Sequence, residues 1–274
     1  MATDKTIVLI TGGNTGLGLE VVKALASSET AYEIIIGCRT PQKGEDAIAT
    51  VKSELPNTRS SMSTVQVDYT SDPLIEEAIR SIDSKFGRLD ILINNGGANY
   101  EHLQAAGKMT LREAWKATWD TNVVGTHILT TLATPLLLKS TNGRIIFIAS
   151  GTSTLTETEL FENPLQQRLN ASPEKGWPKP PAHGPPVLGY RCSKTGMNML
   201  MRDWHRTLLN DGVKVWAVSP GFLATNLGGV GVEVLKKMGA KDPAVGAALI
   251  RSVVDGEHDA NAGKVIRADG VQPW

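Results

Sequence analysis

The chain has 274 residues and a formal net charge of zero, because 28 lysines and arginines balance 28 aspartates and glutamates. This balance argues against a broad surface for nucleic acid or for an anionic membrane, and we expect neither partner. The 2 cysteines lack CxxC spacing and the 5 histidines lack HExxH spacing, which predicts reduced thiols, a cytoplasmic location and no metal site. The apolar run at 7–10 is too short for a signal-peptide core or a membrane span.

Short apolar runs alternate with longer amphipathic stretches along the chain. We expect strands at 7–10, 33–37, 65–67, 89–93, 144–148, 213–218 and 264–266. We expect helices at 16–28, 41–54, 72–86, 110–139, 188–210 and 243–255. This alternation predicts an α/β fold in one domain spanning 1–274, with right-handed crossovers and a parallel sheet covered by helices on both faces. Ligands then bind at the carboxyl ends of the strands.

Residues 156–187 break this rhythm, because they hold half of the chain's 14 prolines. Prolines at this density are expected to prevent a regular helix or a central strand. A solvent-exposed insertion and a lid over the site are both open. The position favours the lid, because the segment joins a strand end to the helix at 188–210 and so emerges where ligands bind.

The run TGGNTGLG at 11–18 follows a predicted strand and opens a predicted helix. Its small residues let the backbone approach a pyrophosphate, and the helix N-terminus offers free N–H donors. A Walker A loop is the alternative, because Gly13 and Gly18 have its glycine spacing. Leu19 and Glu20 stand where that loop needs lysine and Ser/Thr, which argues against phosphoryl transfer.

Arg39 follows the second predicted strand, where NAD sites carry an acid for the ribose diol. The nearest downstream acid is Glu45. Guanidinium suits a 2′-phosphate because it stays charged and donates two parallel hydrogen bonds. We therefore prefer NADP(H) to NAD(H), with a solvated loop arginine as the alternative.

Tyr190 and Lys194 are four residues apart, so a helix at 188–210 places them on one face. A nearby ammonium favours phenolate, and we expect it to lower the tyrosine pKa. The pair then suits proton transfer near neutral pH. An ordinary helix face is the alternative.

These motifs occur in one order, together with NNGG at 94–97 in place of NNAG, Asn122, Ser150, and Ser219-Pro220-Gly221 with Thr225. In this order they resemble the short-chain dehydrogenase/reductase family over nearly the whole chain. The resemblance implies a single doubly wound Rossmann domain with a seven-stranded parallel sheet in the order 3-2-1-4-5-6-7.

The resemblance also implies four catalytic residues. Tyr190 would be the general acid that protonates a carbonyl oxygen, and Lys194 would bind the nicotinamide ribose and lower the tyrosine pKa. Ser150 would hydrogen-bond the substrate oxygen, and Asn122 would support a water path to Lys194. Two prepositioned donors suit a developing oxyanion.

The implied NADP(H) site takes residues from six parts of the chain. Asp68 would face the adenine, Asn94 and Gly96 the ribose side, and Thr225 the nicotinamide carboxamide or the phosphates. Asp68 capping the next helix and Asn94 tying strands together are the alternatives. The complete set is Gly12, Asn14, Thr15, Gly16, Leu17, Gly18, Arg39, Asp68, Asn95, Gly96, Tyr190, Lys194, Pro220, Gly221 and Thr225.

Two features depart from the family pattern. The insertion at 156–187 leaves 39 residues between Ser150 and Tyr190, where most members have about a dozen. A similar enlargement in monomeric carbonyl reductases obstructs the tetramer interface, so a monomer is open here beside a dimer or tetramer. Gly96 replaces alanine, which we interpret as a change in backbone freedom that leaves the chemistry intact.

Residues 222–241 correspond to the family's substrate loop and carry several apolar side chains. They predict an apolar flap over the substrate, with a small satellite core as the alternative. The expected function is NADPH-dependent reduction of a ketone or aldehyde on a bulky, mostly apolar small molecule. An imine or enone reductase is one alternative, and a non-catalytic NADP(H)-binding sensor is another. Ser150 lacks the GxSxG context of a hydrolase.

Overall fold

The structure, a computed structural model, describes residues 4–179 and 187–274. Its eight-stranded sheet has the order β3-β2-β1-β4-β5-β6-β7-β8, and β1 to β7 run parallel. This confirms the predicted sheet. The strands are β1 Thr6–Thr11, β2 Tyr32–Cys38, β3 Ser61–Gln66, β4 Ile91–Asn94, β5 Arg144–Ile148, β6 Lys214–Val218, β7 Val265–Arg267 and β8 Gly270–Gln272.

The eighth strand was not predicted. β8 pairs antiparallel with β7, and Arg267 faces Gly270 across the two-residue connection of Ala268 and Asp269. Gly270 has a φ of 126°, a conformation that glycine adopts readily. The Asp-Gly pair between two short apolar runs was the available hairpin signal.

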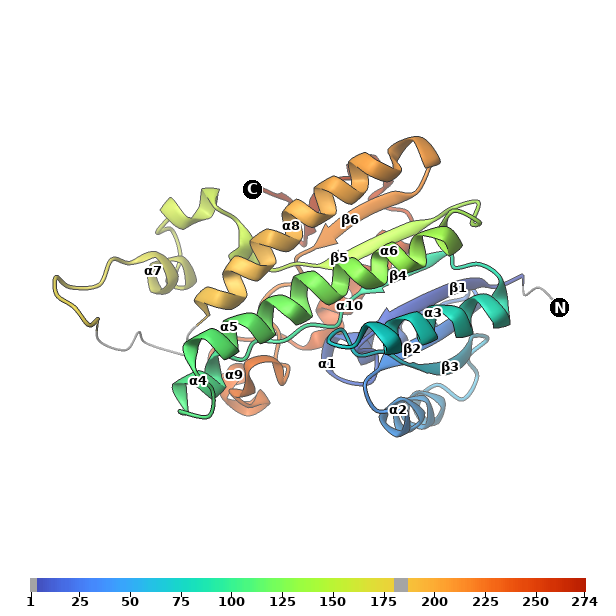
Figure 1. Cartoon of the computed structure of the whole chain (residues 1–274), viewed down its shortest axis with the longest axis horizontal. Coiled ribbons are helices and arrows are strands. Elements are labelled where there is room, and N and C mark those ends of the chain that lie inside the picture. Colours follow the sequence, from blue (N-terminus) through green and yellow to red (C-terminus); the bar gives the residue numbers. More distant parts are fainter. Residues whose placement is uncertain (1–3, 180–186) are drawn as a thin grey trace.

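Helices cover both faces of the sheet (Figure 1). They are α1 Gly16–Ala26, α2 Pro41–Glu54, α3 Asp72–Phe86, α4 Glu101–Ala105, α5 Leu111–Trp119, α6 Thr126–Leu137, α7 Pro164–Asn170, α8 Leu188–Leu208, α9 Val232–Lys237 and α10 Pro243–Val254. One buried core joins α3, α6 and α8 to the sheet, and the other joins α1, α2 and α10 to its opposite face. A parallel sheet buried on both faces explains why its central strands β1, β4 and β5 are largely apolar.

The helix expected at 110–139 is interrupted. A π-helical turn, η1 (Asp120–Gly125), stands between α5 and α6. Gly125 packs onto the chain after β3 so closely that a Cβ there would lie 2.1 Å from the carbonyl oxygen of Tyr69. Such single π turns are frequent at functional sites, and this one contains Asn122.

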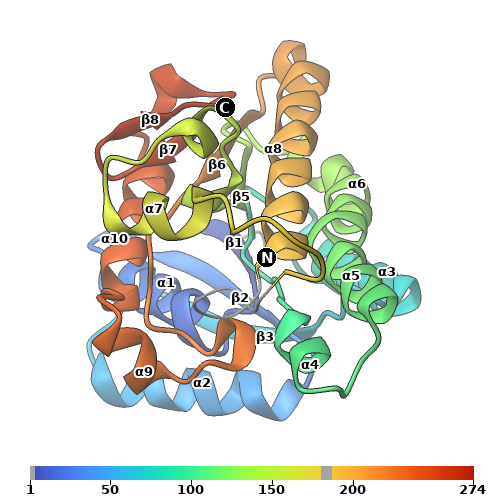
Figure 2. The same ribbon diagram turned by 90° about the vertical axis from the view of Figure 1, so that its left-hand side faces the viewer.

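The insertion contains a regular helix, so that part of the prediction was wrong. Pro164 begins α7, where the missing N–H costs nothing, and the Asn163 side chain accepts a hydrogen bond from the Gln166 N–H at 3.0 Å. Residues 180–186, which also belong to the predicted insertion, lie outside the described residues. Figure 2 shows α7 in front of the sheet, on the side where β5 and β6 end.

Across the two described ranges, none of the helices is long and apolar enough to cross a membrane.

Candidate active site

The glycine-rich turn joins β1 to α1, and its glycines are needed for two different reasons. Gly12 and Gly16 have φ values of 64° and 55°, which disfavour other residues. Gly18 is fixed by packing, because a Cβ there would lie 2.2 Å from the carbonyl oxygen of Gly12. The N-cap residue Thr15 makes no side-chain cap bond, and the first turn of α1 has no acid. The turn therefore suits an anionic group such as a dinucleotide pyrophosphate.

A network of buried and part-buried hydrogen bonds fixes this turn to β4. Asn95 Nδ2 donates to the carbonyl oxygen of Thr11 at 2.8 Å. Thr11 Oγ1 accepts from the N–H groups of Asn95 and Gly96 at 3.0 and 2.9 Å. It also lies 2.8 Å from the Tyr69 hydroxyl, which donates to Asn94 Oδ1 at 3.1 Å. Burial raises the pKa of Tyr69, so this hydroxyl stays neutral.

Gly96 reflects packing rather than backbone freedom, which corrects the interpretation from sequence. It is not among the glycines with positive φ. A Cβ at this position would lie 2.8 Å from Tyr69 Cε2. The Tyr69 ring therefore occupies the space that an alanine methyl group would need.

Asn14 and Leu17 complete the turn. Leu17 packs against α10, because a Cβ on Gly246 of that helix would lie 3.1 Å from Leu17 Cδ1. Arg39 is exposed after β2, and its backbone oxygen accepts a hydrogen bond from the Gln66 amide at 3.0 Å. Asp68 accepts from the N–H and hydroxyl of Thr70 at 2.9 and 2.8 Å. It shapes the turn before α3, whose N-cap is Ser71, so the helix-cap alternative for Asp68 was wrong.

Ser150 follows β5 and begins a short 3-10 turn. Its Oγ accepts from the Thr152 N–H at 3.2 Å and lies 3.0 Å from Thr152 Oγ1. Its carbonyl oxygen accepts from Gln272 Nε2 at 3.2 Å, so strand β8 holds this turn in place. Gln272 was not predicted as a supporting residue.

Lys194 is buried in α8, with 3% of its surface exposed. Its ammonium donates to the Ile148 carbonyl oxygen at 2.6 Å and lies 5.6 Å from the centre of the Tyr190 ring. Burial lowers the pKa of Lys194 to about 7. The loss of hydration outweighs the single carbonyl contact.

The pKa of Tyr190 moves opposite to the prediction. Burial raises it to about 12, and a hydrogen bond with the Ser150 side chain offsets only part of the change. The expected reduction required a fully charged neighbour. Lys194 does not supply one in this environment, because its own charge is disfavoured and its ammonium is bonded to Ile148.

Asn122 is fully buried in η1 and connects two segments. Its Oδ1 accepts from the Ala98 N–H at 2.8 Å, and its Nδ2 donates to the Ala98 oxygen and to Ser193 Oγ, both at 2.9 Å. Next to it, a Cβ on Gly97 would lie 3.6 Å from Lys194 Nζ. Asn122 thus holds the segment after β4 against α8.

The segment after β6 approaches the glycine-rich turn. A Cβ on Gly16 would lie 3.5 Å from the Thr225 side chain. Pro220 and Gly221 precede Thr225, and Gly221 has a φ of 95°. Residues 222–241 contain α9 and are held at their base by a bridge between Leu223 and Lys241. Leu223 is buried whereas Val234 is exposed, so this loop has features of both predicted alternatives.

The family model for short chain dehydrogenase matches residues 6–160. The chain is 41% identical to the short-chain dehydrogenase/reductase tropE of Talaromyces stipitatus over 273 residues, covering 99% of each. It is 42% identical to the short-chain dehydrogenase/reductase eupG of a Phoma species over 282 residues, covering 100% of this chain and 99% of that protein.

Among solved structures, the NADPH-bound carbonyl reductase from chicken fatty liver superposes with a TM-score of 0.76 at 22% identity, covering all of both chains. This likeness supports the fold. The chain belongs to the short-chain dehydrogenase/reductase family and is an oxidoreductase.

Proposed function

We propose that this protein is an NADPH-dependent reductase of a carbonyl group on a bulky, mostly apolar small molecule. The closeness of the Ser150 and Tyr190 side chains, beside Lys194, carries this proposal. Two hydroxyl donors on one side of a site suit a carbonyl oxygen that gains negative charge. The glycine-rich turn supplies the accompanying nucleotide site.

The bound nicotinamide would supply the hydride. Tyr190 donates its proton to the carbonyl oxygen, so that a C–H and an O–H bond form while the C=O double bond is reduced. Ser150 donates a hydrogen bond to the same oxygen. A raised pKa keeps Tyr190 protonated for this step. Lys194 binds ribose hydroxyls and Asn122 holds the neighbouring backbone.

Arg39 supports the preference for NADPH. Its side chain is exposed at the end of β2, at the position where an NAD site carries an acid. Among the described residues no side-chain partner is recorded for it, which leaves its guanidinium available to a phosphate. The carbonyl reductase with the same fold was solved with NADPH bound.

The substrate loop supports an apolar substrate. Phe222, Leu227 and Met238 are 37 to 42% exposed on it. Contact with a bulky substrate would remove this apolar surface from water. The two unpaired cysteines further support our proposal of a cytoplasmic location.

Loss of NADPH absorbance tests the proposal across aromatic ketones, quinones, aldehydes, cyclic imines and enones, with NADH in parallel. We expect carbonyl turnover with NADPH, a fall of at least about 100-fold in Tyr190→Phe, and a loss of the NADPH preference in Arg39→Ala. Turnover confined to imines or enones would replace the carbonyl assignment. Saturable NADPH binding without turnover of any compound would favour the sensor.

A further inference from the structure

Helix α8 carries both Tyr190 and Lys194 but begins without a cap of its own. Its N-cap residue, Val187, makes no side-chain bond to the first turn. The first N–H groups of a helix have no partner within the helix and need one from elsewhere. Here the partner comes from a residue 88 positions earlier.

Glu101 supplies this cap. One carboxylate oxygen accepts from the Gly189 N–H at 3.0 Å, and the other accepts from the Tyr190 N–H at 3.1 Å. The Glu101 residue is only 4% exposed. Negative charge at this end also interacts favourably with the helix dipole. Charge-assisted bonds of this kind are stronger than neutral ones.

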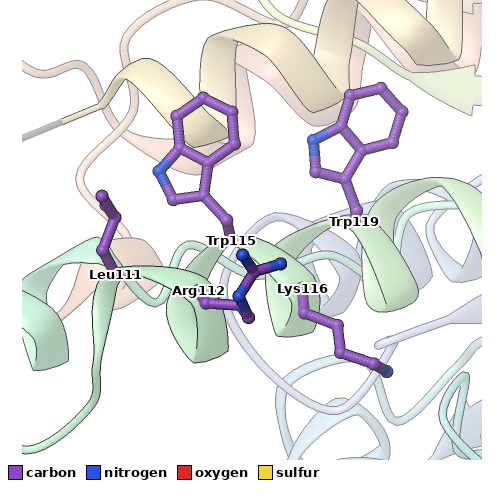
Figure 3. A pocket seen from close by; sticks show the side chains of 5 residues that line it. All are labelled: Leu111, Arg112, Trp115, Lys116 and Trp119. Carbon is purple, nitrogen blue, oxygen red and sulfur yellow. The ribbon is translucent and has the colours of Figure 1, made fainter.

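The start of α8 is also enclosed from the side. A Cβ on Gly189 would lie 3.2 Å from the Trp115 indole and 3.4 Å from the Glu101 carboxyl carbon. Figure 3 shows Trp115 and Trp119 projecting from α5 towards α8, and both side chains line a groove of about 540 Å³. Glycine at 189 therefore allows the side chains of Trp115 and Glu101 to reach the backbone of the first turn.

Tyr190 and Lys194 depend on this cap to different degrees. Tyr190 is the third residue of α8, and its own N–H is one of the two that Glu101 accepts. Lys194 lies one turn later, and its ammonium is fixed by Ile148. Loosening the first turn would thus move Tyr190 more than Lys194.

We propose that Glu101 is a positioning residue for Tyr190. The proposal rests on the proposed function, in which Tyr190 donates the proton. Glu101 acts through the backbone of α8, by holding the tyrosine hydroxyl at the distance from the substrate that proton transfer requires.

The short helix α4, which begins at Glu101, also contacts the substrate loop. A Cβ on Gly229 would lie 2.6 Å from the His102 ring, and one on Gly228 would lie 3.4 Å from the Asn99 amide. Asn99 Oδ1 in turn accepts from the Glu101 N–H at 3.0 Å. Residues 99–102 therefore join the substrate loop to the backbone of Tyr190.

The test compares Glu101→Gln with Glu113→Gln. Glutamine keeps one acceptor but places an NH₂ group against the second N–H. Glu113 is a matched control, because it caps α5 in an exposed capping box. The measurements are kcat per NADPH-binding site, NADPH Kd and Tm. Counting sites by NADPH binding removes any unfolded fraction from kcat.

We expect Glu101→Gln to lower kcat by about 10- to 100-fold with NADPH Kd changed less than about twofold. Glu101→Asp, which keeps both oxygens, should recover part of this loss. Glu113→Gln should lower Tm without changing kcat. An unchanged kcat in Glu101→Gln, or an equal loss of kcat and NADPH affinity, would overturn the proposal.

Amide hydrogen exchange separates this inference from the proposed function. In Glu101→Gln the amides of Gly189 and Tyr190 should exchange at least about tenfold faster than in the wild type, whereas those near Lys194 should not change. Unchanged exchange at Tyr190 would contradict the positioning role even in an active enzyme. If the wild type reduces no carbonyl compound, the proposed function fails, and the exchange data still decide whether Glu101 holds Tyr190. If Glu101→Gln does not fold, the same measurements on Glu101→Asp decide.

Discussion

The cofactor side and the substrate side of this site are built differently. On the cofactor side, Thr11, Asn95 and Tyr69 form buried or part-buried hydrogen bonds between segments 58 to 85 residues apart. On the substrate side, Asn170 in the insertion bonds to Glu157 and Leu160, only 13 and 10 residues away. The cofactor side is tied to neighbouring strands of the sheet, whereas the insertion combines such short-range bonds with a few ties to distant segments, among them Arg267 to Glu157 at 2.6 Å and Arg191 to Leu169 at 3.3 Å.

This difference predicts that the two sides respond differently to substitution. Buried polar groups with full partners specify one arrangement, and disturbing them is costly. Exposed loops tolerate change and carry specificity. Substitutions on the cofactor side should therefore lower stability and nucleotide binding, whereas those on the substrate side should change substrate selection alone.

The largest effect is expected for Gly18→Ala. The new methyl group would lie 2.2 Å from the Gly12 oxygen, so the turn must open, and we expect loss of NADPH binding and a fall in Tm of several degrees. Gly151→Ala is the comparison on the substrate side, because its methyl would meet nothing closer than Ser219 Oγ at 3.6 Å. NADPH fluorescence titration and thermal melts check both. Equal falls in Tm would remove the contrast between the sides.

A double-mutant cycle sharpens the comparison at Gly96. We expect Gly96→Ala to destabilise the protein by about 1 to 3 kcal/mol, because its methyl group overlaps the Tyr69 ring. In a Tyr69→Leu background the same change should cost less, since the ring is gone. Denaturant unfolding measures the coupling. Strictly additive effects would show that the ring does not exclude alanine.

Lys194 lies between the two sides and gives a pH signature. Its pKa is about 7 in the folded protein and about 10.5 when unfolded, so the unfolded chain binds more protons between these values. Stability without nucleotide should therefore rise with pH from about 7 to 9, by at most about 1.4 kcal/mol per unit. Lys194→Met should flatten this slope in denaturant titrations. Identical slopes in both proteins would contradict the burial effect.

The smallest effect on stability is expected for Trp177→Ala. This side chain is 88% exposed in the insertion, so the free energy of unfolding should change by less than about 0.5 kcal/mol. NADPH affinity should also be unchanged, while KM for a ring-shaped ketone changes. Kinetics with ring-shaped and linear substrates check this. A marked fall in stability would mean that the insertion is held as firmly as the nucleotide site.

Periodicity was sufficient to predict an α/β fold with a parallel sheet, and the family resemblance supplied the strand order. The predicted bounds of α2 and α3 agree with the structure, and the glycine turn, Ser150, Tyr190 and Lys194 lie at the carboxyl ends of the strands or in the adjoining helix. These features depend on local pattern and on motif order. They needed no knowledge of which distant residues are in contact.

The features that were missed depend on such contacts. The need for glycine at position 96 arises from the Tyr69 ring beside it. The π turn depends on the close packing of Gly125 onto Tyr69. In the sequence, Glu101 is one acid in a polar stretch, and its contact with the Tyr190 N–H is evident only when α8 is placed beside it. The predicted shift of the Tyr190 pKa had the wrong direction, because spacing along a helix indicates proximity to a cation but does not indicate burial.

The bond between Gln272 and Ser150 has a consequence for the order in which the protein is made. The two residues are 122 positions apart. At about 5 to 20 residues per second, on the order of ten seconds of synthesis separates them. During that time the nascent chain has the strands beside the proposed nucleotide site but not the strand that supports Ser150, the residue proposed to bind the carbonyl oxygen. A chain released early would keep part of the binding site and lack an ordered centre for the reaction.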